Sequence, residues 1–133
     1  MFRIIITFLF VGVFLFSHSL MSKAQDKEFP IIVALKQGSS KAISSFLGEM
    51  VEIRFDNNKR DFSKSQAEIV LANFFKGNPI SNFELLKHQK IDSETSFLIG
   101  TYNSSSNSFK VFIRGKELND ENWLVYSVDF VKE

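Results

Sequence analysis

Histidine is the side chain best suited to acid–base chemistry near neutral pH, and this chain contains two, His18 and His88. His18 lies in an N-terminal segment that we expect to be removed, so His88 is the candidate general base. It lies beside Lys87 and just before Gln89 and Lys90, a setting typical of a strand residue that faces solvent. We therefore predict no catalytic residue and keep His88 as the alternative.

The other chemistry-bearing residues argue against a metal site or a bound cofactor. The chain has no cysteine, which excludes disulfides and thiolate ligands. The oxygen-rich segment at residues 56–61 lacks the loop glycine and terminal glutamate of a calcium-binding loop. We predict no metal and no cofactor.

The N-terminus has the pattern of an export signal. Arg3 precedes an uncharged apolar run, Ile4 to Phe16, which is shorter than the roughly 20 residues that a membrane span requires. Ser22 and Ala24 are the small residues that signal peptidase accepts. We predict a signal peptide over residues 1–24; the alternative is an uncleaved anchor. Without a cysteine to carry lipid, the product is expected to be periplasmic or secreted and not lipid-anchored.

The remaining residues, 25–133, are enough for one domain with one core. Loss of Arg3 and Lys23 would leave 14 of the 16 basic residues against 15 acidic ones. This balance gives no electrostatic basis for binding nucleic acid or an anionic membrane. We therefore expect neither as a partner.

Apolar spacing and capping residues predict three helices. The first begins at Pro30 and ends at Gly38, and the second is capped by Ser39 or Ser40. The clearest helix follows a capping-box pattern of Ser63 and Gln66 and stops at residues 77–79.

Alternating apolar residues predict five strands, at residues 50–55, 83–88, 95–103, 109–114 and 123–132. The polar segment 56–61 is interpreted as a turn. The order α-α-β-α-β-β-β-β indicates an α+β fold, with the helices packed on one face of a curved antiparallel sheet.

This order resembles the cystatin-like roll of the nuclear transport factor 2-like superfamily, in which a glycine and small polar residue separate two helices, as at residues 32–43. More narrowly, three stretches are similar to an exported bacterial family known as domain of unknown function 4783. They are residues 63–68 with Phe74-Phe75-Lys76, residues 86–89 and residues 99–101. The family has no assigned activity, so the resemblance carries over no catalytic residue.

The superfamily's ligand sites lie in a cone between helices and sheet, which implies a pocket lined by Leu71, Phe74, Tyr126 and Phe130. Its isomerases pair a carboxylate with a hydrogen-bond donor, often a tyrosine. Asp129 and Tyr126 are three apart on one strand, so the period of two places them on opposite faces. Tyr102 is the alternative donor.

The last strand also suggests a partner surface. Its expected inner set is Leu124, Tyr126, Val128 and Phe130, which leaves Trp123 and Val125 outside with Phe112 of the preceding strand. An outward aromatic and aliphatic patch is typical of an interface. By analogy with the superfamily we expect a homodimer, or an envelope protein as partner.

These observations favour an exported, non-enzymatic module that binds a ligand or another protein. The alternative is a SnoaL-like isomerase, hydratase or hydrolase that acts on a small apolar molecule. A carboxylate or His88 at the bottom of a closed cone would favour the enzyme. A cone filled with side chains would favour the binding module.

Overall fold

The computed structural model describes residues 29–118 and 122–133, so the predicted signal peptide lies outside the described residues. The described elements are α1 (Pro30–Gln37), α2 (Ser40–Ser44), β1 (Leu47–Phe55), β2 (Asn58–Ser63), α3 (Lys64–Gly77), β3 (Ile80–Lys90), β4 (Ser96–Ser104), β5 (Ser108–Glu117) and β6 (Trp123–Lys132). The predicted α+β class is confirmed.

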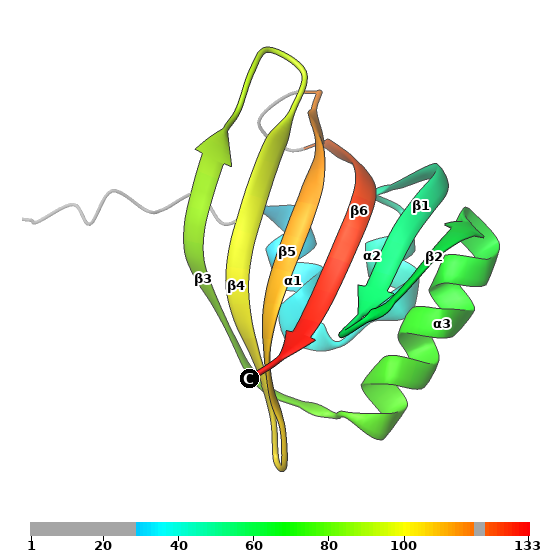
Figure 1. The fold of residues 1–133 in the computed structure, drawn as a ribbon, viewed down its shortest axis with the longest axis vertical. Helices are drawn as coiled ribbons and strands as arrows, with labels where there is room; N and C mark the ends of the chain where they lie inside the picture. The colour runs from blue at the N-terminus through cyan, green and yellow to red at the C-terminus, as the bar shows by residue number, and fades with distance from the viewer. Residues whose placement is uncertain (1–28, 119–121) are drawn as a thin grey trace, which may run out of the picture.

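The strands form one curved sheet in the order β2-β1-β6-β5-β4-β3. Neighbouring strands are antiparallel except β1 and β6, which are parallel. Helices α1 and α2 lie behind the sheet in the view of Figure 1, and α3 lies beside β1 and β2. The side of the sheet that α1 and α2 cover is called the inner face below, and the opposite side the outer face.

Helix ends follow the predicted capping chemistry. Gly38 adopts a left-handed φ of 61° that ends α1, and the Ser39 side chain accepts a hydrogen bond from the backbone N–H of Ala42. Ser63 and Gln66 form the expected capping box at α3.

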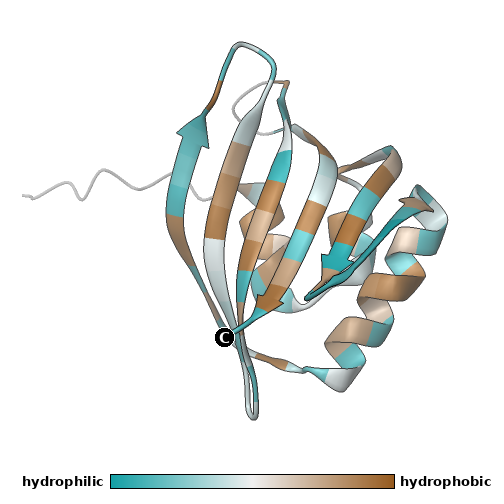
Figure 2. Cartoon of the chain, in the orientation of Figure 1, coloured by the Kyte–Doolittle hydropathy of each residue, from teal (hydrophilic) through white to brown (hydrophobic). Residues whose placement is uncertain are grey.

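The interpretation of residues 56–61 as a turn was wrong, because most of the segment belongs to β2. The turn is only Asp56–Asn57, and Asp56 adopts a positive φ of 52°, which aspartate tolerates. The strand lies at the edge of the sheet and is largely hydrophilic (Figure 2). It therefore has no run of alternating apolar residues by which a sequence pattern would reveal it.

A β-bulge at Tyr126 reverses the faces of β6 part-way along the strand. Arg114 lies opposite Ser127, but the next residue, Gly115, lies opposite Val125, so Tyr126 is unpaired. Val128 is buried as predicted, whereas before the bulge the buried residues are Val125 and Trp123. The predicted inner positions of two residues were wrong: Leu124 is 44% exposed and Tyr126 42%.

Gly115 permits the close approach that this bulge requires. A Cβ atom at Gly115 would lie 2.6 Å from the carbonyl oxygen of Leu124, a backbone atom of the neighbouring strand. A second register shift lies in β3, where Leu85 is opposite Gly100 and Lys87 is opposite Ile99.

That second shift sets the direction of His88. Beyond it, His88 lies opposite Leu98, which is buried on the inner face. The residue is nevertheless exposed, as expected for a strand residue that faces solvent.

Candidate functional site

Aromatic side chains fill the space between α3 and the sheet. The ring of Phe74 lies 4.3 Å from that of Phe130 and 5.1 Å from those of Phe55 and Phe109 (centroid distances). Phe130 is 1% exposed, and Leu71 is fully buried. Three of the four predicted pocket residues, Leu71, Phe74 and Phe130, thus lie in or against the hydrophobic core.

Tyr102 packs in the same cluster, and its hydroxyl, the one polar group of its side chain, is hydrogen-bonded. Its hydroxyl donates a hydrogen bond to the backbone carbonyl of Asn78. Burial raises the pKa of Tyr102 to about 12, so this phenol stays neutral over the physiological range. It is a structural hydrogen-bond donor rather than an acid poised for catalysis.

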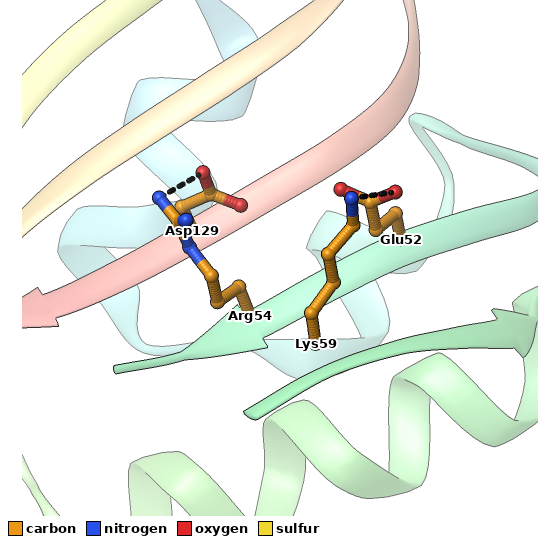
Figure 3. Close-up of polar contacts among 4 residues, drawn as sticks. All are labelled: Glu52, Arg54, Lys59 and Asp129. Atoms are coloured by element: carbon orange, nitrogen blue, oxygen red, sulfur yellow. Dashed lines mark hydrogen bonds and ion pairs between the residues drawn. The ribbon is translucent and has the colours of Figure 1, made fainter. Parts of the chain in front are cut away.

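The fourth predicted pocket residue, Tyr126, lies apart from this cluster. Its hydroxyl donates to Thr95, 3.4 Å away at the protein surface. The bulge also overturns the expectation that Tyr126 and Asp129 lie on opposite faces. Asp129 pairs with Arg54 of β1 on the outer face, at 3.0 Å (Figure 3), so neither Tyr126 nor Asp129 enters the cone.

The outer face carries a second ion pair beside the first. The Lys59 Nζ lies 3.3 Å from a carboxylate oxygen of Glu52, so β1, β2 and β6 present two neighbouring ion pairs there (Figure 3). The Asp129 side chain is 8% exposed, and its Oδ1 has no hydrogen-bond partner. These charges belong to the side of the sheet remote from the aromatic cluster.

His88 takes part in a separate cluster on the inner face. Its Nε2 contacts a carboxylate oxygen of Glu117. Its ring lies edge-on to Phe29 at 4.7 Å and to Trp123 at 5.8 Å. About a third of the His88 side chain is exposed, so the residue is not at the bottom of a closed cone.

The predicted interface residues divide between the two faces. Trp123 is 3% exposed and Val125 fully buried, so their predicted outer position was wrong, and neither can meet a partner directly. Phe112 lies on the outer face as expected, half-buried opposite Ile99 and Asp129.

An open apolar groove runs between β2 and α3, here called the β2–α3 groove. Three adjoining depressions of about 400, 340 and 300 Å³ make it up, and Val70 lines all three. Its apolar walls are half-buried aromatic and aliphatic residues together with the buried Ile53 and the exposed Ile69. The lining residues include Phe55, Arg60, Phe62, Ile69, Val70 and Phe74.

Cross-strand register shows which β2 residues face this groove. Arg60 lies opposite Ile53, and Phe62 lies opposite Val51, both of which are buried. Residues directly opposite on an antiparallel pair project to the same face. The alternate residue, Lys59, instead pairs with Glu52 on the outer face.

The groove could not be predicted from the sequence because β2 was not recognised as a strand. Without that strand, the sequence did not indicate which face of the sheet Arg60 and Phe62 occupy. The signal was present in the Asp56–Asn57 pair, which is suited to a two-residue hairpin.

Within the described ranges, no three histidine, cysteine or acidic side chains gather in a way that could hold a metal ion. Nor does any helix in those ranges have the length and apolarity to cross a membrane.

The model of one family, Domain of unknown function (DUF4783), matches residues 29–130. The chain belongs to the DUF4783 family. A DUF4783 protein of Bacteroides ovatus is similar, with 28% identity and a TM-score of 0.72 over 78% of this chain and 93% of the other. No curated protein matches.

Two more distant structures show which known folds this chain is similar to. A Nostoc punctiforme domain with a cystatin-like fold has 11% identity and a TM-score of 0.58, over 78% of this chain and 71% of the other. An NTF2-like protein of Cytophaga hutchinsonii has 12% identity and a TM-score of 0.56, over 78% and 90%. The predicted family and cystatin-like, NTF2-like fold are confirmed.

Proposed function

We propose that this protein is an exported, non-enzymatic binding module that holds a small apolar ligand in the β2–α3 groove. The observation that carries the proposal is the pairing of a filled cone with an open groove. Phe74 contributes to both, since its ring packs on Phe130 and also lines the groove beside Phe55.

The size and lining of the groove suit such a ligand. Ligand sites typically measure about 300–1,000 Å³ and are mostly apolar, with a few polar groups that fix orientation. Phe55, Phe62 and Val70 supply the apolar surface, and Arg60 is the charged group among them. A module that only needed a stable core would gain from closing over these rings, since buried apolar area is stabilising.

The alternative, an isomerase, hydratase or hydrolase, has less support. Such an enzyme needs a base in contact with an enclosed substrate. The cone is occupied by Tyr102, Phe109 and Phe130, and the carboxylate of Asp129 lies on the other face. His88 keeps a carboxylate partner, but at the partly exposed end of the sheet.

The proposal can be tested by titrating the neutral dye Nile red, whose fluorescence increases in apolar surroundings, into the protein comprising residues 25–133. Val70→Trp fills the groove and should abolish the dye signal. Ala72→Trp places the same side chain on an exposed position of the same helix and should leave it unchanged, as should His88→Ala. Thermal melts check that each variant folds. A second groove variant is Ile69→Gln, at a residue that is 62% exposed. It should weaken the dye signal without affecting folding.

Two results would count against the proposal. One is dye binding that survives both Val70→Trp and Ile69→Gln. The other is dye binding lost in His88→Ala, which would move the site to the Phe29–Trp123 end. Native mass spectrometry of protein from its own host would then identify any retained ligand.

A further inference from the structure

Arg60 lines the β2–α3 groove, and its positive charge indicates which class of ligand the groove would bind. We propose that the groove binds an anionic amphiphile, a monocarboxylate with a linear apolar chain, whose carboxylate is held by Arg60. This inference rests on the proposed function of the groove as a ligand site.

Arg60 is free to take an anion. It is exposed, and no other described residue forms an ion pair or hydrogen bond with its side chain. The neighbouring cation Lys59, by contrast, is paired with Glu52. A guanidinium presents a planar fork of donors that matches a carboxylate with two hydrogen bonds.

The position of Arg60 places the head group at one end of the groove. Arg60 lines the two depressions shared with Phe62 but not the third, which is formed by Phe55, Val70, Asn73 and Phe74. A ligand whose carboxylate contacts Arg60 would therefore extend its chain towards the aromatic third depression. The methylene stem of Arg60 adds apolar wall on the way.

The other polar groups of the groove do not oppose an anion strongly. Asn58, Gln66 and Asn73 are neutral. Asp61 lines one of the two depressions that Arg60 also lines, but it lies opposite Glu52, whose side chain is on the outer face with Lys59. Its carboxylate is therefore directed away from the face that Arg60 and Phe62 share.

The length of the groove sets the probe. Along α3 the lining runs from Gln66 to Phe74, which is about 12 Å at 1.5 Å per residue. A chain of about ten carbons fits this span, so decanoate is the probe and decanol its uncharged counterpart.

The experiment titrates decanoate and decanol into wild type, Arg60→Gln and Lys59→Gln by calorimetry at low salt. Decanoate should bind wild type more tightly than decanol, and Arg60→Gln should weaken decanoate about threefold to tenfold while leaving decanol unchanged. Lys59→Gln removes the same charge from the outer face and should leave both affinities within about twofold. Arg60→Lys should recover part of the decanoate affinity.

The outcomes separate this inference from the function on which it rests. Equal binding of decanoate and decanol, unaffected by Arg60→Gln, would overturn the anion preference and keep the apolar site. Failure of both probes to bind, with Nile red also unbound, would overturn both. An equal loss of decanoate affinity in Lys59→Gln and Arg60→Gln would show nonspecific charge attraction and would also overturn the proposal.

Discussion

Replacing Gly115 with alanine tests the bulge that sets the two faces of β6. The added Cβ would lie 2.6 Å from the Leu124 carbonyl oxygen and 3.1 Å from the Val125 Cα. Both are backbone atoms of a paired strand, so they cannot rotate aside as the end of a side chain can. Either β5 and β6 separate locally or the bulge moves.

The expected cost is the balance of two effects. Overpacking of this kind costs about 1–3 kcal/mol. Loss of glycine freedom in the unfolded chain returns about 0.4–1 kcal/mol. We expect Gly115→Ala to lower the free energy of unfolding by about 1–2 kcal/mol, which corresponds to roughly 4–16 °C in melting temperature for a domain of this size.

Gly77→Ala is the matched control, because nothing lies within 4 Å of the added Cβ. Gly77 is the last residue of α3, so alanine there should be neutral or stabilise by up to about 1 kcal/mol. Urea unfolding followed by tryptophan fluorescence measures both variants, and Trp123 is the single tryptophan of the chain.

The emission spectrum adds a second readout. If the bulge moves in Gly115→Ala, Trp123 should become more exposed and its emission should shift to the red. A Gly115→Ala protein as stable as Gly77→Ala, with unchanged emission, would refute the role assigned to Gly115.

Three further predictions follow from burial and from one pKa. Phe130→Ala should cost about 3–5 kcal/mol of unfolding free energy, whereas Leu124→Ala on the same strand should cost less than about 1 kcal/mol. Equal losses of stability in urea unfolding would contradict the assignment of Phe130 to the inner face and Leu124 to the outer face. The pKa of Tyr102 is raised from 10.0 to about 12, so its contribution to stability is present at pH below about 10 and should be lost as pH rises through about 12. Tyr102→Phe should lack this loss in alkaline unfolding experiments. An identical dependence of stability on pH in wild type and variant would contradict the prediction. If copies associate through the outer face, light scattering should show a dimer that Phe112→Lys dissociates, and a wild type that stays monomeric at high micromolar concentration would argue against this interface.

Local chemistry explains why the helices could be predicted from sequence. The caps at Ser39 and Ser63 and the stop at Gly38 depend on residues within a few positions along the chain, so the sequence carries the whole signal. The same holds for the order of the elements other than β2, which was enough to identify the fold class.

The faces of β6 could not be predicted in the same way. Period-two alternation is correct on each side of Tyr126, but the bulge depends on pairing with residues of β5 that lie ten or more positions away along the chain. The contact of His88 with Glu117 could not be predicted for the same reason, since the register shift in β3 arises where Leu85 and Lys87 pair with β4. Trp123 therefore seemed to be an interface residue although it lies in the core.

The candidate site depended on the element that was hardest to detect. β2 is a polar edge strand, and charged residues on such a strand prevent unwanted pairing rather than create a hydrophobic pattern. Arg60 and Phe62 acquire a common face only when the pairing of β2 with β1 is known.

The most direct test of ligand binding in the β2–α3 groove is a two-dimensional amide NMR titration of residues 25–133 with decanoate. Binding in the groove should cause chemical-shift changes concentrated in β2 and along α3, at Arg60, Phe62 and Val70, with little change at Leu98 or Val125 in the core. Changes centred instead on His88, Glu117 and Trp123 would contradict it, because they would place the ligand at the other end of the inner face.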